Sequence, residues 1–220
     1  QRDGLTRKAV ILINPNSTTA MTESALAAAR KTAPEIDFEG WTSTEGPPAI
    51  EGPEDGDRAV PPLLKLVEKA SEAGAEVIII ACFDDTGLAE AQALASCPVI
   101  GIGQAAYVLA SLVSGSTAVV TTVHAAVPVI EANIRSQGHA AQITTVRAAN
   151  VPVLMLEDDP ATAAAAFEAT VRTLPDDTAN VILGCAGAVS ITAILQDRLA
   201  LNIMDGATSA ARLCKALVQT

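Results

Sequence analysis

Hydrophobic residues along this chain are grouped into short continuous runs, separated by longer stretches that are rich in alanine. A short apolar run without apolar/polar alternation is typical of a strand buried on both faces of a parallel sheet. Such runs predict strands at Ala9–Ile13, Glu76–Ala81, Val99–Ile102, Thr117–Thr122, Val181–Gly184 and Leu201–Met204. Helical patterns between the runs predict helices at Thr19–Ala33, Arg58–Ala73, Leu88–Ala95, Gln104–Val113, Pro128–Gln137, Pro160–Leu174, Val189–Asp197 and Ala207–Val218. This alternation of strands and helices predicts an α/β fold with a mostly parallel sheet.

The second half of the chain loosely repeats the order of the first half. Glu76–Ala81 leads into Cys82 and Asn180–Gly184 leads into Cys185, an offset of 103 residues. Two further strand-to-helix junctions recur at similar offsets. Matches of this kind can arise by chance in any protein built from alternating strands and helices, but several at nearly one spacing favour two similar half-chains. In that case Cys82 and Cys185 are equivalent points of two lobes and face each other across a cleft.

The composition of the chain restricts its class of partner. The chain has 220 residues, a net charge of −11 and only five aromatic residues. Nucleic acid and anionic membranes are bound by clustered cations, and bases also need aromatic stacking platforms. The first apolar run ends at Asn14-Pro15-Asn16, and no run approaches the roughly 18 residues of a membrane span. We therefore expect a soluble, cytoplasmic protein that binds a small molecule rather than nucleic acid or a membrane.

The cysteines and histidines do not predict a disulfide framework or a metal site. The four cysteines form no CxxC pair, and neither His124 nor His139 has a metal-binding spacing. There is no GxGxxG after the first strand and no Walker A sequence, so we expect no metal and no nucleotide cofactor. Cys97 and Cys214 are interpreted as small hydrophobic packing residues. His124 could handle protons, although a lone histidine at a strand end is more often structural or exposed.

Cys82 and Cys185 have a pattern that favours chemistry over packing. Each closes a buried strand and precedes a glycine-containing turn into a helix. Ligands of parallel sheets bind outside the carboxyl ends of the strands, and a helix N-terminus lowers the pKa of a thiol. Two sulfurs that face each other can invert a stereocentre: one thiolate removes a proton from a carbon acid, and the opposite thiol returns a proton to the other face. Such a reaction needs no cofactor.

Four segments together carry a family resemblance. They are Asn14–Thr18, Gly46–Gly52, Ala81–Asp84 and Leu183–Gly187, and they resemble the hydantoin racemase branch of the Asp/Glu racemase superfamily. The resemblance implies cofactor-independent, two-base racemisation at C5 of a 5-substituted hydantoin. It also implies a homo-oligomer.

The resemblance also implies two pseudo-symmetric α/β lobes, each with a mostly parallel sheet flanked by helices, and an active site in the cleft between them. We assign residues 1–103 and 206–220 to the first lobe, which carries Cys82. Residues 104–205 form the second lobe, which carries Cys185. The stretch Thr42–Asp57 is expected to be a surface loop, because it is rich in Gly, Pro and acidic residues, and the resemblance makes it a candidate lid.

Individual roles follow from the same resemblance. Cys82 and Cys185 match the two acid/base cysteines of the family. The residues implied to bind substrate are Asn14, Asn16, Ser17, Phe83, Asp84, Thr121, Thr122, Ala186 and Gly187. The main-chain amides near Phe83, Ala186 and Gly187 are expected to donate to the developing oxyanion, whereas Asp84 could instead pair with a helix terminus or be solvated.

The chain departs from the family pattern at Thr86, at Ala188 and at Gln104, where proline, methionine and glutamate are common. Two alternatives to a hydantoin racemase stay open. The first is a related racemase that acts on allantoin, aspartate, glutamate or another small carbon acid. An amino acid would need more charge complementarity than the neutral Asn, Ser and Thr residues offer. The second is a non-catalytic, two-lobed protein that binds a small ligand.

Overall fold

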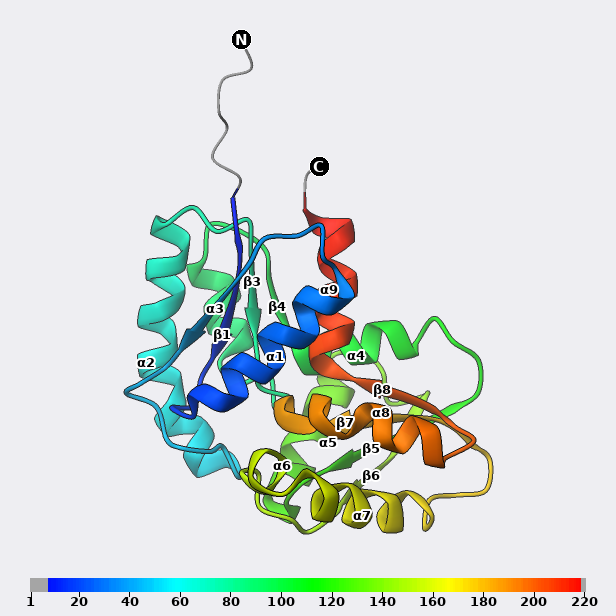
Figure 1. Ribbon diagram of the computed structural model, residues 1–220. Helices are drawn as coiled ribbons and strands as arrows, with labels where there is room; N and C mark the ends of the chain where they lie inside the picture. Colours follow the sequence, from blue (N-terminus) through cyan, green and yellow to red (C-terminus); the bar gives the residue numbers. More distant parts are fainter. Residues whose placement is uncertain (1–7, 219–220) are drawn as a thin grey trace.

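The computed structural model describes residues 8–218 and contains two four-stranded sheets, each flanked by helices (Figure 1). The first sheet has the order β2-β1-β3-β4 and the second has the order β6-β5-β7-β8. The strands are β1 (Val10–Asn14), β2 (Phe38–Thr42), β3 (Val77–Ile80), β4 (Val99–Gly101), β5 (Ser116–Thr121), β6 (Ile143–Ala148), β7 (Thr178–Gly184) and β8 (Asn202–Asp205). Each neighbouring pair is parallel. The predicted α/β fold with two similar lobes is confirmed.

Strands β2 and β6 were not predicted, and both lie at the edge of their sheet. Their residues are mostly half-buried or exposed, as in the sequence Phe-Glu-Gly-Trp-Thr of β2. An edge strand with a solvated face carries no continuous apolar run, so the pattern that identified the inner strands missed these two. They complete the internal repeat, because the two sheets have the same strand order.

The predicted helices are all present with shifted ends. They are α1 (Thr19–Thr32), α2 (Pro53–Glu72), α3 (Leu88–Leu94), α4 (Ile102–Ala110), α5 (Val127–Ser136), α7 (Pro160–Val171), α8 (Val189–Arg198) and α9 (Gly206–Leu217). The structure adds the short helix α6 (Met155–Asp158) and the 3₁₀ turns η1 (His124–Ala126) and η2 (Ala186–Ala188).

The stretch Thr42–Asp57 is not a loop throughout, because α2 already begins at Pro53. Proline is well suited to the first position of a helix, and Glu54 and Asp55 in the first turn complement the helix dipole. The expectation of a loop to Asp57 was therefore wrong for its last five residues. The remaining segment, from the end of β2 to Gly52, connects the first sheet to the region of the two cysteines.

The inner strands of both sheets, β1, β3, β5 and β7, are buried on both faces, as their continuous apolar runs predicted. In β1, Val10 and Leu12 belong to a large core cluster that includes both lobes, whereas Ile11 and Ile13 pack in a second cluster beneath α2 and α3. Helix α9 packs against α1 and α4 beside the first sheet. The assignment of residues 1–103 and 206–220 to the first lobe, and of residues 104–205 to the second, stays a proposal.

Candidate active site

Cys82 and Cys185 line one pocket at the carboxyl ends of β3 and β7. Cys185 is 8% exposed and Cys82 is half-buried. The pocket also contains six further residues that the sequence predicted for the site: Asn16, Phe83, Asp84, Thr121, Thr122 and Ala186. Its remaining lining residues were not predicted: Met21, Ile50, Ala81, Ala126, Val153 and Gly184. Among these, Ile50 lies in the Gly46–Gly52 motif, which could have indicated it as a lining residue. Val153 lies in an irregular segment, and no feature of the sequence indicated that it lines the pocket.

The free volume of the pocket is about 20 Å³. That space holds about one water molecule and is too small for a five-membered ring with a substituent. The pocket is therefore closed to such a ring in this arrangement, and we expect a lining segment to move when a substrate enters.

Asn16 presents its amide nitrogen to the pocket. Its Oδ1 accepts hydrogen bonds from Asn14 Nδ2 at 2.8 Å and from the main-chain N–H of Thr18 at 3.0 Å. Asn14 Oδ1 in turn accepts the main-chain N–H of Asn16 at 3.0 Å. Because Oδ1 is occupied, Nδ2 is the group left for a ligand, and it contacts Met21 Sδ at 3.4 Å. Asn16 can thus donate to a carbonyl oxygen, and Asn14 holds it in place.

Three predicted site residues do not line the pocket: Asn14, Ser17 and Gly187. Asn14 instead forms two hydrogen bonds with Asn16, which does line the pocket. Ser17 donates its main-chain N–H to Pro47 O at 2.9 Å, which ties the Asn14–Thr18 turn to the Gly46–Gly52 segment. In the second lobe, Thr121 Oγ1 donates to Gly184 O at 2.8 Å and fixes the end of β7 next to Cys185.

Burial favours the protonated form of both thiols in this closed form. Burial raises the pKa of Cys185 to about 12, although the N–H groups of Gly187 and Ala186 oppose this shift. Burial also raises the pKa of Cys82 well above its usual range, and the Asp84 carboxyl adds to that rise. A hydrogen bond between Cys82 Sγ and Thr86 Oγ1, 3.3 Å apart, acts in the opposite direction. The expectation that the following helix leaves the thiols with a lowered pKa was wrong, because desolvation outweighs the helix amides.

We therefore expect slow alkylation of the site cysteines by iodoacetamide. At pH 8 Cys185 should react at least about tenfold more slowly than Cys97, a half-buried cysteine outside the pocket, because thiolate is the reactive form. The rate at Cys185 should rise about tenfold per pH unit up to about pH 11. Peptide mass spectrometry after timed labelling measures each site separately. A rate at Cys185 above that at Cys97 would contradict the closed, protonated form.

Asp85 holds the segment that carries Cys82 against the start of α4. Its Oδ1 accepts the N–H of Gly103 at 3.0 Å, and its Oδ2 accepts Gln137 Nε2 of α5 at 3.1 Å. A side chain at Gly101 or Gly103 would collide with the Asp85 carboxylate, so glycine is required at both positions for this close approach. Gln104 caps the same helix through the N–H of Gly101, at 3.2 Å.

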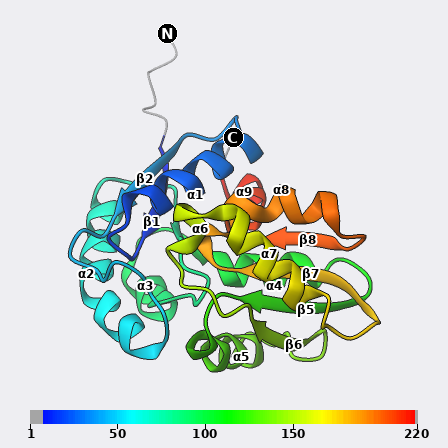
Figure 2. The same cartoon turned by 60° about the horizontal axis from the view of Figure 1, so that its bottom comes forward.

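Several hydrogen bonds join the two lobes around the pocket. Asn133 Nδ2 of α5 donates to Asp84 O at 2.8 Å, next to the Gln137–Asp85 bond. The main-chain N–H of Val153 donates to Glu51 Oε1 at 2.8 Å, so the segment that carries Ile50 is attached to the second lobe. Ser24 Oγ of α1 donates to Glu157 Oε2 of α6 at 3.0 Å, and Figure 2 shows these two helices side by side.

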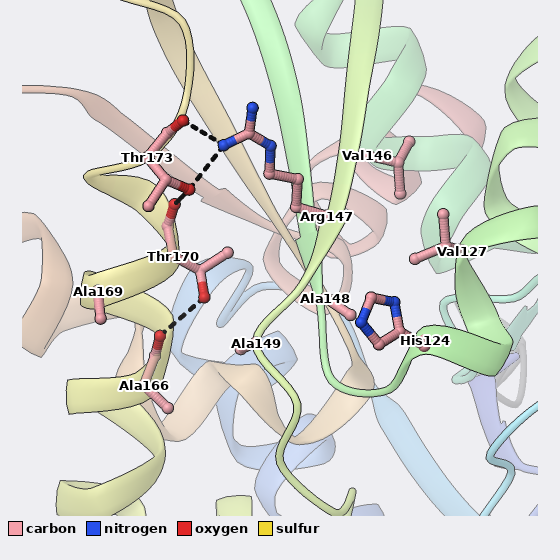
Figure 3. Close-up of a pocket in the computed structure, with 10 residues that line it drawn as sticks. All are labelled: His124, Val127, Val146, Arg147, Ala148, Ala149, Ala166, Ala169, Thr170 and Thr173. Atoms are coloured by element: carbon pink, nitrogen blue, oxygen red, sulfur yellow. Dashed lines mark hydrogen bonds between the residues drawn. The ribbon is translucent and has the colours of Figure 1, made fainter.

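A wider groove on the second lobe lies apart from the thiols (Figure 3). Side chains of β6, α7 and the turn at His124 line it, and no cysteine is among its lining residues. Arg147 donates to the main-chain oxygen of Thr173 and to Thr173 Oγ1 on one side of the groove. His124 lies on the opposite side and does not line the cysteine pocket, so a role for it as a third proton handler has no support.

Within residues 8–218 there is no cluster of three or more His, Cys, Asp or Glu side chains that could hold a metal ion. None of the helices described for this part of the chain is long and apolar enough to cross a membrane.

Comparison with known proteins assigns the chain to a family. The sequence profile described as Asp/Glu/Hydantoin racemase matches residues 10–214, nearly the whole chain. The chain belongs to the Asp/Glu/hydantoin racemase family. The resemblance drawn from the four sequence segments is therefore confirmed, and the chain is an enzyme of the isomerase class that acts as a racemase.

Similar members of this racemase family cover almost the same length. A hydantoin racemase from Rhizobium meliloti is 37% identical over 210 residues, which are 94% of this chain and 87% of that protein. A hydantoin racemase from Paenarthrobacter aurescens is 30% identical over 213 residues, or 95% and 90% of the two chains. Among solved structures, the allantoin racemase from Klebsiella pneumoniae has a TM-score of 0.89 and 32% identity and covers 96% of this chain and 87% of its own.

The two lobes of the racemase share one arrangement of the main chain around their cysteines. The main-chain N–H two residues after each cysteine is directed at the sulfur: that of Asp84 at Cys82, and that of Gly187 at Cys185. Each N–H stabilises a thiolate at its own cysteine. The amides of Ala186 and Gly187 are thus directed at Cys185, whereas Asn16 lines the pocket with its side chain.

Proposed function

We propose that this racemase inverts C5 of a 5-monosubstituted hydantoin by proton transfer between Cys82 and Cys185. The observation that carries the proposal is that the two thiols, from equivalent strand ends of two lobes, line one pocket together with the amide nitrogen of Asn16. Relatives that are named hydantoin racemases support the same substrate class.

The proposed reaction needs one thiolate and one thiol. The thiolate takes the C5 proton, which is acidified by the adjacent C4 carbonyl, and the electron pair moves onto the carbonyl oxygen as an enolate. The Asn16 amide N–H groups can donate to that oxygen, where charge develops in the transition state. The opposite thiol then gives its proton to the other face of C5. At the end the two cysteines have exchanged protonation states, and no proton is gained or lost overall.

Allantoin is a second candidate substrate. It is itself a hydantoin with a ureido group at C5, and the allantoin racemase named above has a closely similar fold. Aspartate and glutamate fit less well, because the lining of the pocket within the described chain includes no lysine, arginine or histidine to pair with a carboxylate. The non-catalytic binding protein is set aside, since the chain belongs to a racemase family.

A panel of enantiopure 5-substituted hydantoins, allantoin, aspartate and glutamate in D₂O tests the substrate class. We expect loss of optical rotation and deuterium at C5 for at least one hydantoin, and no exchange for the two amino acids. Polarimetry and proton NMR follow the two events on the same sample. Racemisation of an amino acid with no reaction of any hydantoin or of allantoin would contradict the proposal. The homo-oligomer and the cytoplasmic location stay predictions.

A further inference from the structure

Asp84 places a carboxyl group in a pocket that has no cationic side chain among its described lining residues. We propose that Asp84 makes the site selective for neutral carbon acids, since its carboxylate repels ligands that carry a carboxylate and can accept a hydrogen bond from the N–H of a neutral ring. The inference rests on the proposed function and deepens it, because it assigns the substrate's charge to one residue.

The two neighbouring aspartates have different surroundings. The Asp85 carboxylate has a structural role, because it accepts hydrogen bonds from Gly103 and Gln137, and it does not line the pocket. Asp84 is half-buried and lines the pocket, and its main-chain oxygen is held by Asn133 Nδ2. Within residues 8–218 its side chain has no hydrogen-bond partner, so its oxygens are available to a ligand.

Asp84 also breaks the pseudo-symmetry of the site. The residue two positions after Cys82 is Asp84, whereas the residue two positions after Cys185 is Gly187, with no side chain. Both residues direct a main-chain N–H at their cysteine, so the backbone function is the same in the two lobes. The carboxyl group is an addition on one side only, and the backbone geometry of the thiols does not require it.

Within the described part of the chain, the titratable groups that interact with Asp84 are all acids. Asp85 is its neighbour in sequence, Cys82 and Cys185 line the same pocket, and the buried Tyr107 hydroxyl of α4 lies close enough for Asp84 to raise its pKa. Burial, with a smaller contribution from Asp85, raises the pKa of Asp84 to about 7. The repulsion of an anionic ligand therefore strengthens as the pH rises from about 6 to 8. Repulsion between two like charges at close range in a partly desolvated pocket weakens the affinity for the ligand by at least about tenfold.

A pair of ligands with the same side chain tests the proposal: a 5-substituted hydantoin, which is neutral, and its ring-opened N-carbamoyl amino acid, which is an anion. Dissociation constants are measured by calorimetry for the unmodified enzyme, for Asp84→Asn and for Asp84→Ser. Glu90→Gln, an exposed site in α3, is the matched control for loss of one negative charge. Thermal unfolding verifies that each variant is folded. If Asp84→Asn does not fold, Asp84→Ser takes its place in the comparison.

We expect loss of the Asp84 carboxyl to raise the affinity for the N-carbamoyl amino acid, relative to the affinity for the hydantoin, by at least about tenfold at pH 8. In the unmodified enzyme, binding of the anion should weaken between pH 6 and pH 8, and most of this dependence should disappear in Asp84→Asn. Any slope left belongs to Asp85, which titrates in the same range. Glu90→Gln should leave both ligands unchanged.

Two results would overturn the inference: an unchanged ratio of anion to hydantoin affinity in both Asp84 variants, or no binding of the hydantoin to the unmodified enzyme. Failure of the proposed function is seen separately. In that case the hydantoin binds with the expected charge selectivity but its C5 hydrogen is not exchanged in D₂O.

Discussion

Replacement of either Cys82 or Cys185 by serine is expected to lower the rate of racemisation by about 10³-fold or more. A serine hydroxyl is a far weaker acid than a thiol, so the variant lacks one of the two groups that exchange a proton with C5. Each single variant keeps one thiol on one face of the substrate. We therefore expect Cys82→Ser and Cys185→Ser each to exchange the C5 hydrogen of one enantiomer without inverting it, and the preferred enantiomer to differ between the two.

Polarimetry in parallel with deuterium NMR on each pure enantiomer separates inversion from exchange. Cys97→Ser is the control, because Cys97 is half-buried outside the pocket, and this variant should keep its activity. Near-full racemisation by both single variants would rule out the two-thiol mechanism.

Substitution of Gly103 by alanine is expected to lower the free energy of unfolding by about 2 to 3 kcal/mol. The new Cβ would lie against the main-chain oxygen of Phe83 and 2.9 Å from Asp85 Oδ2, so the segment that carries Cys82 must shift. For a chain of this size the midpoint of thermal unfolding should fall by roughly 4 to 12 °C. Racemisation should decrease more than stability alone explains, because Cys82 directly precedes Phe83.

Gly56→Ala is the matched control in α2. A Cβ at Gly56 meets no atom within 4 Å, and alanine is favoured over glycine in a helix by up to about 1 kcal/mol. This variant should therefore be as stable as the unmodified protein or slightly more stable. Calorimetric unfolding of both variants measures the contrast, and equal stability of Gly103→Ala and Gly56→Ala would show that the contact with Asp85 is not tight.

The inner strands and the positions of the two cysteines could be predicted because their signals are local. A continuous apolar run identifies a buried parallel strand, and a cysteine directly after it lies at the end of the sheet where ligands bind. The edge strand Phe38–Thr42 has no such run, since one of its faces is solvated. Its presence becomes evident only from the pairing with β1.

The walls of the site and the protonation of its thiols depend on contacts between distant segments. Ile50 and Val153 meet in the pocket because Glu51 accepts the N–H of Val153, a bond between residues 102 positions apart. The direction of the thiol pKa shift was predicted wrongly for a similar reason. The helix amides are visible in the sequence, but the burial that outweighs them depends on the tertiary packing around the thiol.

The single-water size of the closed pocket has a consequence for the timing of repeated turnovers. Under the two-thiol mechanism each turnover releases an enzyme whose cysteines have swapped roles, and this form is competent only for the enantiomer just produced. To process the first enantiomer again, the free enzyme must first protonate the buried thiolate that the turnover left behind, and that proton must enter a space of about 20 Å³. At low substrate concentration this reset is complete before the next encounter. At high concentration of one enantiomer, substrate arrives faster than the sulfurs re-equilibrate, so the recovery of the empty enzyme, rather than the chemistry at C5, limits the net rate.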